Sequence, residues 1–183
     1  MAPTTRRVVI TGIGAITPLG LSAGATWRAM LAGTSGAAPI TRFDATDFTT
    51  KFACEVKRFD PLTVMDRKLA RRLDPVCQFA IAAVDEALRD AGLAPGSIDN
   101  ADAVGVVFGT GIGGIQTFQD QAETWVRGGA GKLSPFFIPM MIPDMVAGII
   151  SIQFGLRGPN HSVVSACATG NHNLADAVAL VRA

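Results

Sequence analysis

Cys167 lies where a short strand is expected to pass into a helix, a position that can turn a thiol into a nucleophile. The alternating segment 161–166 predicts the strand, and the apolar segment 168–181 predicts a largely buried helix. At a helix N-terminus, free backbone N–H groups and the helix dipole favour thiolate over thiol. A pKa lowered by one to two units would raise the ionised fraction at pH 7 from about 3% to roughly a quarter or more. Cys167 is therefore a candidate covalent nucleophile; the alternative is a buried structural cysteine.

Two histidines in the sequence could act as a base for Cys167. Six residues of extended strand separate His161 from Cys167, which corresponds to as much as about 20 Å. His172 follows Cys167 by five positions, which places it about 140° around a helix and off the same face. We therefore expect both histidines to have ordinary polar partners, and the acid–base groups that assist Cys167 to lie outside this sequence.

Strands and helices alternate along the sequence, and these elements must position Cys167. Asp74 as N-cap and Pro75 in the first turn predict the clearest helix. Ser22 is the expected N-cap of an earlier helix. The expected strands are 8–12, 51–56, 103–108 and 161–166, and the expected helices are 23–32, 75–92, 115–126, 143–154 and 168–181. This order indicates one α/β domain with a mostly parallel sheet.

Gly109, Gly111 and Gly114 have G-x-G-x-x-G spacing between an expected strand and an expected helix. That context is typical of a dinucleotide-binding loop, so an NAD-dependent reductase is one possible function. A dinucleotide site also needs a second strand ending in Asp or Glu about 20 residues further on, whereas 123–129 indicates a helix end. The alternative is that the glycines allow the backbone to approach closely at a crowded site.

The composition is that of a globular enzyme rather than a nucleic-acid-binding or membrane protein. The formal net charge of +1 gives no global attraction to nucleic acid. Cys54, Cys77 and Cys167 are widely spaced, which indicates neither a disulfide framework nor a zinc cluster. The most apolar segment, 136–152, contains two prolines and an aspartate and would span a membrane poorly. We expect a cytoplasmic protein without metal, organic cofactor, nucleic-acid partner or membrane partner.

Seven segments of the sequence occur in an order typical of one protein family. Residues 165–170 read Ser-Ala-Cys-Ala-Thr-Gly around the candidate nucleophile. The other segments are 6–20, 50–53, 71–74, 109–114, 134–139 and 155–159. Together they resemble the β-ketoacyl-ACP synthases of the elongating, malonyl-ACP-using type, which are the condensing enzymes of fatty-acid and polyketide synthesis. Asn160, His161 and Asn171 depart from the family pattern.

This resemblance implies both a fold and an activity. The fold is thiolase-like, with two similar halves in αβαβα layers, and residues 1–183 resemble the N-terminal half without its last strands. Cys167 would take an acyl chain from a carrier or CoA thioester and condense it with malonyl-ACP, with no cofactor, in a homodimer. Ile112, Phe137 and Ala166 would line the acyl pocket, with Phe137 contributed by the dimer partner.

Two basic clusters would dock the acyl-carrier protein, on the same resemblance. The first is Arg67, Lys68, Arg71 and Arg72, and the second is Arg127 with Lys132. Positive charge near a site entrance raises the encounter rate with an acidic partner and fixes its orientation. The alternative is an ordinary solvated helix face, on which the neighbouring Asp66 and Asp74 balance the charge.

Members of this family are roughly twice as long as this sequence. Two histidines and a lysine that assist condensation belong to the half that residues 1–183 lack, so we expect these residues alone to lack condensation activity. The alternative is a truncated or non-catalytic subunit that works only with a complementary chain. Apolar surface left bare on the helix after Cys167 would then favour association or aggregation.

Overall fold

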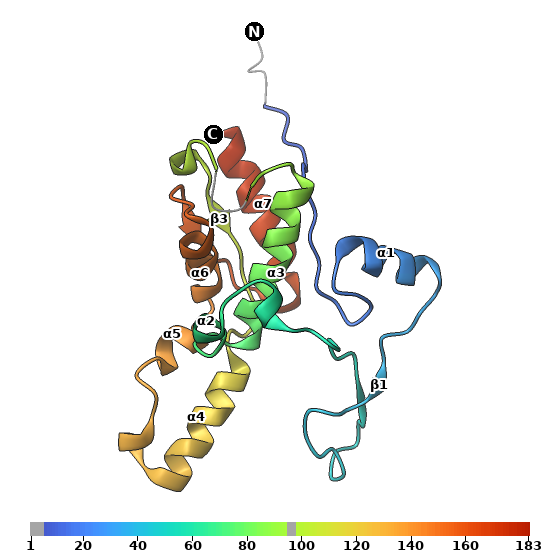
Figure 1. Ribbon diagram of the computed structural model, residues 1–183, viewed down its shortest axis with the longest axis vertical. Coiled ribbons are helices and arrows are strands. Elements are labelled where there is room, and N and C mark those ends of the chain that lie inside the picture. Colours follow the sequence, from blue (N-terminus) through green and yellow to red (C-terminus); the bar gives the residue numbers. More distant parts are fainter. Residues whose placement is uncertain (1–5, 95–97) are drawn as a thin grey trace.

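Two helices, α3 (Pro75–Asp90) and α6 (Met145–Phe154), pack against each other and form the core of the chain. The computed structural model describes residues 6–94 and 98–183. Figure 1 shows α3 in the middle of the molecule, with α6 on one side and the N-terminal segment on the other. Burying one large apolar side chain contributes about 1.5–3 kcal/mol, so this contact is the main source of stability. The most completely buried side chains are Cys77, Ile81, Val146 and Ile150.

The start of α3 follows from its first two residues. Asp74 Oδ1 accepts a backbone N–H of the first turn, and Pro75 occupies a position where no N–H is needed. The helix ends before Gly92, whose φ of 73° lies in the left-handed region that suits glycine. Asp74 Oδ2 accepts the N–H and the hydroxyl of Thr117, both at 2.9 Å, in α4 (Ile115–Gly128). One buried carboxylate therefore caps α3 and fixes α4 against it.

A short parallel strand pair lies next to this helix core. β3 (Val106–Val107) pairs in parallel with β4 (Asn160–His161). α6 packs on both strands, and α7 (Thr169–Arg182) contacts β3. The expected α/β class and parallel pairing are confirmed. The strands expected at 103–108 and 161–166 are shorter, with two paired residues each.

A second strand pair lies in the excursion between the first helix and the core. β1 (Ala38–Pro39) pairs antiparallel with β2 (Phe52–Ala53). β2 falls within the strand expected at 51–56, whereas no strand was expected at β1. Pro39 has no N–H to donate to a ladder, which suits the edge of this two-stranded pair. In Figure 1 this pair projects away from the core. Among the described residues, pairing is therefore parallel only between β3 and β4.

The strand expected at 8–12 is wrong for this structure. The segment is extended, but it runs along α3 rather than pairing with another described strand. The N–H of Ile13 donates to Asp90, and the N–H of Ala15 donates to Glu86, each at 2.9 Å. Backbone donors that follow the segment are thus satisfied by carboxylates of α3. Its apolar side chains predict a strand, but a strand also needs a neighbouring strand.

The contact between this segment and α3 depends on a glycine, and we predict opposite effects for two glycine substitutions. A Cβ at Gly14 would lie 1.8 Å from the carbonyl oxygen of Ala83, so Gly14→Ala should destabilise the protein by about 3 kcal/mol or more. In the first turn of α1 (Ala23–Leu31), a Cβ at Gly24 would meet only Arg28 Nη1 at 3.5 Å. Gly24→Ala should stabilise the protein by about 0.5 kcal/mol. Thermal unfolding followed by circular dichroism measures both effects. Equal unfolding midpoints for the two variants would contradict a close contact between Gly14 and α3.

The remaining helical segments are short, and only the first of them, which begins at Ala23, was expected from the sequence. The N–H of Ala25 donates to the side chain of Ser22, which caps α1 as expected. The helix expected at 143–154 begins at Met145, after a separate α5. These elements are α1 (Ala23–Leu31), α2 (Arg67–Ala70), α5 (Phe137–Met141) and the 3₁₀ segments η1 (Pro61–Thr63), η2 (Ala101–Ala103), η3 (Ala130–Lys132) and η4 (Ala166–Ala168).

The last helix, α7, is not largely buried, so that expectation is wrong for this structure. Its two buried residues, Thr169 and Asn173, are polar, whereas Leu174 is 55% exposed. The reason is that α7 contacts β3 and η4 on one side and leaves its other faces uncovered by the described residues. None of the helices in residues 6–94 and 98–183 has the length and apolarity needed to cross a lipid bilayer.

Candidate active site

Cys167 lies in the single turn η4, and this turn directly precedes α7. Ala166, the residue before Cys167, has a φ of 49° in the left-handed region, which costs a non-glycine residue about 1–2 kcal/mol. Such strain typically occurs at functional sites, because the surrounding structure must hold it. The Cys167 side chain is exposed. The expected position at the start of the last helix is confirmed, and the alternative of a buried structural cysteine is wrong.

Both histidines have polar partners, as expected. His172 Nδ1 and Ser165 Oγ lie 2.6 Å apart. His161 Nε2 lies 3.6 Å from Asp176 Oδ2, and both side chains are partly exposed. His172 thus contacts the turn that carries Cys167 through a serine rather than through the sulfur.

The glycine loop, residues 109–114, is a place of close backbone packing. A Cβ at Gly109 would lie 2.4 Å from the carbonyl oxygen of Val163, and one at Gly113 would lie 2.3 Å from that of Met141. These distances confirm that the glycines permit close approach. After α4 the chain continues into η3 and α5, where a dinucleotide site would require a strand. The glycine spacing therefore gives no support to NAD binding.

An apolar cavity of about 250 Å³ opens beside this loop. A Cβ at Gly111 would lie 3.4 Å from the carbonyl oxygen of Ala166, so the loop that carries Ile112 touches the turn that carries Cys167. The rings of Phe118 and Phe137 lie 6.4 Å apart between centroids, which places Phe137 beside a wall of the cavity. The lining residues are Ile112, Gly114, Ile115, Phe118, Met141 and Pro143. Of the three residues expected around an acyl pocket, Ile112 lines this cavity, Phe137 packs on Phe118 of its wall, and Ala166 touches the backbone of the glycine loop at Gly111.

The first basic cluster lies on and just after α2. Arg67 and Lys68 belong to the helix, and Arg71 is its C-cap residue. The guanidinium carbon of Arg72 lies 4.9 Å from the centroid of the Phe136 ring, a cation–π contact. That contact links the cluster to the residue before α5.

The second basic cluster lies at the far end of α4. Arg127 Nη2 is 3.3 Å from Glu123 Oε2, an exposed pair one helical turn apart. Exposed pairs of this kind contribute about 0–1 kcal/mol, so Arg127 remains able to exchange partners. Lys132 lies in η3, where its side chain passes close to Gly128.

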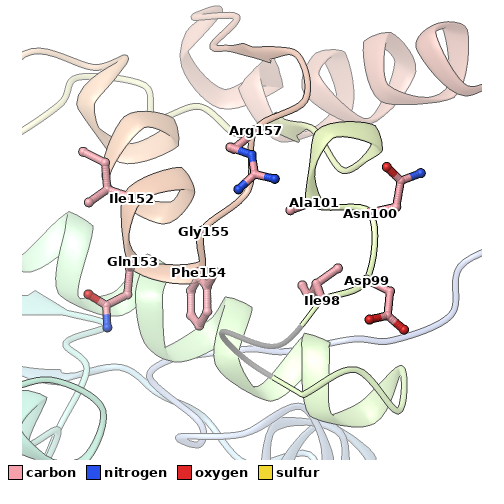
Figure 2. A pocket seen from close by; sticks show the side chains of 9 residues that line it. All are labelled: Ile98, Asp99, Asn100, Ala101, Ile152, Gln153, Phe154, Gly155 and Arg157. Carbon is pink, nitrogen blue, oxygen red and sulfur yellow. The ribbon is translucent and has the colours of Figure 1, made fainter.

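A cavity of about 660 Å³ lies elsewhere in the described part of the chain (Figure 2). It is formed by the end of α6, the residues that follow it and the segment that leads into η2. Arg157 points toward it, but its Nε lies 2.6 Å from Asp102 Oδ1 in an exposed pair. The cavity is open and mainly polar, and it contains none of the expected site residues. The smaller apolar cavity beside the glycine loop is therefore the better candidate, because that loop touches the turn that carries Cys167.

The other two cysteines differ from Cys167 in their environment. Cys77 is 1% exposed within the core, and its burial, together with the charge of Asp74, raises the pKa of the thiol to about 12. Cys54 is exposed in the segment after β2. Among the residues that the structure describes, His, Cys, Asp and Glu side chains form no group of three that could hold a metal ion.

Two polar residues of α7 at the site were not expected from the sequence. Thr169 and Asn173 are buried, and both hydrogen-bond to the chain that leads into Cys167. Their spacing of four positions places them on one face of the helix. A threonine and an asparagine four positions apart, shortly after a candidate nucleophile, are the feature of the sequence that could have indicated these backbone contacts.

The comparison with protein families decides what this arrangement is. Residues 5–183 match the family described as "Beta-ketoacyl synthase, N-terminal domain". The chain belongs to the β-ketoacyl synthase family. This confirms the resemblance expected from the segments around Cys167 and the glycine loop.

Curated relatives and solved structures agree with this membership. The chain is 45% identical over 177 residues to the 3-oxoacyl-[acyl-carrier-protein] synthase 2 of Synechocystis sp. and 46% identical over 176 residues to that of Coxiella burnetii. These matches cover 97% and 96% of this chain and 42% of each relative. The chain thus spans less than half the length of these relatives.

Among solved structures, the ishigamide ketosynthase/chain length factor superposes with a TM-score of 0.85 at 28% identity, over 97% of this chain and 45% of that chain. A β-ketoacyl synthase from Burkholderia phymatum STM815 superposes with a TM-score of 0.80 at 26% identity, over 97% of this chain and 44% of that chain. The expected thiolase-like ketosynthase fold is therefore confirmed for the half that this chain spans.

Proposed function

We propose that this protein is a β-ketoacyl-ACP synthase in which Cys167 carries the acyl chain. The observation that carries the proposal is the exposed thiol on a strained turn at the start of α7. The curated relatives named 3-oxoacyl-[acyl-carrier-protein] synthase 2 support the reaction class. Those names give no support to a non-catalytic subunit or to an NAD-dependent reductase.

The proposed reaction has two balanced steps. The Sγ atom of Cys167 attacks the carbonyl carbon of an acyl thioester, the bond to the donor sulfur breaks, and the donor thiol leaves with a proton. Malonyl-ACP then loses CO₂, and the resulting carbanion attacks the carbonyl carbon of the acyl-Cys167 thioester. The bond to Sγ breaks, which yields β-ketoacyl-ACP and free Cys167. No oxidant, metal or organic cofactor enters either step.

The acyl chain would lie in the apolar cavity beside the glycine loop. Ile112 would contact the chain directly, and Ala166 would flank the thioester because the loop touches its backbone. Phe137 would close the pocket through its contact with Phe118, in this subunit or across a homodimer. The backbone N–H of Cys167 would supply one donor to the developing oxyanion.

The acyl-carrier protein would dock on the two basic clusters, Arg67, Lys68, Arg71 and Arg72 on one side and Arg127 with Lys132 on the other. The exposed pair of Arg127 with Glu123 is weak enough to be exchanged for a carboxylate of the carrier. Through the contact of Arg72 with Phe136, the first basic cluster lies against the residue before α5, so a carrier bound to this cluster would lie near that segment. We place the reaction in the cytoplasm.

Condensation is proposed for a protein in which residues 1–183 form the N-terminal ketosynthase domain and act together with a complementary half. Large apolar side chains of the N-terminal segment support this, because Val9 and Ile10 are 61% and 71% exposed. Apolar surface of this kind typically marks an interface. The two histidines and the lysine that assist condensation in this family would come from that complementary half, so we predict that residues 1–183 alone do not condense malonyl-ACP.

The test is to map the acyl group after incubation with an acyl-CoA of medium chain length. We expect one acyl adduct on the peptide that contains Cys167 and none on the Cys54 peptide. Cys54 is the matched control because it is also exposed but lies outside the site. Mass spectrometry after proteolysis at mildly acidic pH, where thioesters survive, gives the position. Equal adducts on Cys54 and Cys167, or none on Cys167, would contradict the proposed function.

A further inference from the structure

The side chain of Asn173 makes three hydrogen bonds, two of which bind Val163 in the chain that leads into the nucleophile. Its Oδ1 accepts the N–H of Val163 at 3.1 Å, and its Nδ2 donates to the carbonyl oxygen of Val163 at 2.8 Å. Nδ2 also donates to the carbonyl oxygen of Thr169 at 2.8 Å. Asn173 is only 4% exposed, and each of these bonds is therefore shielded from water. The amide takes the place of a neighbouring strand at Val163, beyond the end of β4.

Two other residues of α7 bind the next part of the same chain. Thr169 Oγ1 accepts the N–H of Ser165 at 2.9 Å, and His172 Nδ1 lies 2.6 Å from Ser165 Oγ. Thr169, His172 and Asn173 thus bind Val163 and Ser165. We call these three residues of α7 the α7 clamp. Ala166 and Cys167 follow immediately, so the clamp fixes the strained turn from its N-terminal side.

The glycine loop closes the clamp from the opposite side. A Cβ at Gly109 would lie 2.5 Å from Asn173 Nδ2 and 2.8 Å from Thr169 Cγ2. The absence of a side chain at Gly109 therefore lets the loop press against both clamp residues.

We propose that Asn173 is a positioning residue for acyl transfer, acting through the α7 clamp to hold Cys167 in its reactive geometry. The inference rests on the proposed function, because it assigns Asn173 a part in that reaction. The physical reason is that the left-handed backbone conformation of Ala166 is strained. It would relax to a negative φ if the clamp released the residues before it. Attack on a bound thioester requires the sulfur at a fixed place, whereas alkylation by a small reagent requires only that the thiol be accessible.

Asn173→Asp tests this with almost no change of shape. A carboxylate keeps an acceptor for the N–H of Val163 but replaces both donated bonds with oxygen facing oxygen. Asn171→Asp is the matched control, since it adds the same charge at an exposed position of α7. Thr169→Val removes the clamp hydroxyl at equal size, and Thr169→Ser restores it.

Each variant is measured in two ways with the purified protein. Acylation of Cys167 by acyl-CoA should fall roughly tenfold or more in Asn173→Asp and in Thr169→Val, because small misplacements of a reacting atom are costly. Thr169→Ser should recover most of this loss, and Asn171→Asp should match the unchanged protein. Alkylation of Cys167 and Cys54 by iodoacetamide should change by less than about twofold. Buried Cys77 should stay unlabelled, which reports an intact core.

The outcomes separate the positioning role from the alternatives. Unchanged acylation in Asn173→Asp and Thr169→Val would overturn it while leaving the proposed function standing. Acylation that falls only together with labelling of Cys77 would also overturn it, because the effect would then be loss of the fold. An unchanged protein that accepts no acyl group on Cys167 would overturn the proposed function and, with it, the role of Asn173.

Discussion

Cys167→Ala is expected to abolish acyl transfer, with a loss of at least about a thousandfold in the rate of acyl-enzyme formation. The expectation follows from the position of Cys167, since the other two thiols cannot take over its role. Cys77 lies within the core with a raised pKa, and Cys54 lies directly after β2, in the excursion between α1 and the core. The readout is the intact mass of the protein after incubation with acyl-CoA.

The substitution should leave the fold almost unchanged, because the Cys167 side chain is exposed and contributes little burial. An unfolding midpoint close to that of the unchanged protein would show this. Cys54→Ala is the control and should retain full acylation. Residual acylation of Cys167→Ala above the background of chemical acyl exchange would place the nucleophile elsewhere.

Local sequence patterns predicted the helices and the nucleophile because each depends on residues close together in the chain. Asp74 and Pro75 are sufficient to define the start of α3, and Ser22 similarly defines the start of α1. The position of Cys167 at the start of α7 followed from a change of pattern over a few residues. Cap chemistry and hydrophobic periodicity are local, and they were confirmed.

The strands were predicted less well because pairing depends on distant partners. The segment 8–12 has the apolar residues of a strand, yet its neighbour here is α3, through Gly12, Gly14 and two carboxylates. The exposure of α7 has the same origin, because the sequence of a helix shows that a face is apolar but not what covers it.

The roles of the glycine loop and of Asn173 also required three dimensions. G-x-G-x-x-G spacing fits both a phosphate-binding loop and a crowded backbone. The distance from Gly109 to Val163 favours the crowded backbone, as does the course of the chain after α4 into η3 and α5. Asn173 comes six residues after Cys167 in the sequence, and its contacts with Val163 reach ten residues back. The fold brings these segments together, and the family comparison then gives the thiol its reaction class.

The second large effect concerns Asp74, which joins the two helices that carry the core and the acyl cavity. Asp74→Ala should lower the free energy of unfolding by about 3 kcal/mol. It removes the cap of α3 and leaves the N–H and hydroxyl of Thr117 unpaired in a buried place. For a chain of this length, the midpoint of thermal unfolding should fall by roughly 6–12 °C. Differential scanning calorimetry measures the change.

Asp66→Ala is the matched control, since Asp66 is also an N-cap but is exposed and binds only the first turn of α2, through the N–H of Leu69 at 2.7 Å. It should cost about 1 kcal/mol, so the difference between the two variants measures the link between α3 and α4. Asp74→Asn keeps one acceptor oxygen, so its cost in free energy of unfolding should lie between the costs of Asp66→Ala and Asp74→Ala. Because α4 carries Ile115 and Phe118 of the cavity wall, Asp74→Asn should also weaken acylation of Cys167. Equal costs for Asp74→Ala and Asp66→Ala would mean that α4 is held by apolar packing alone.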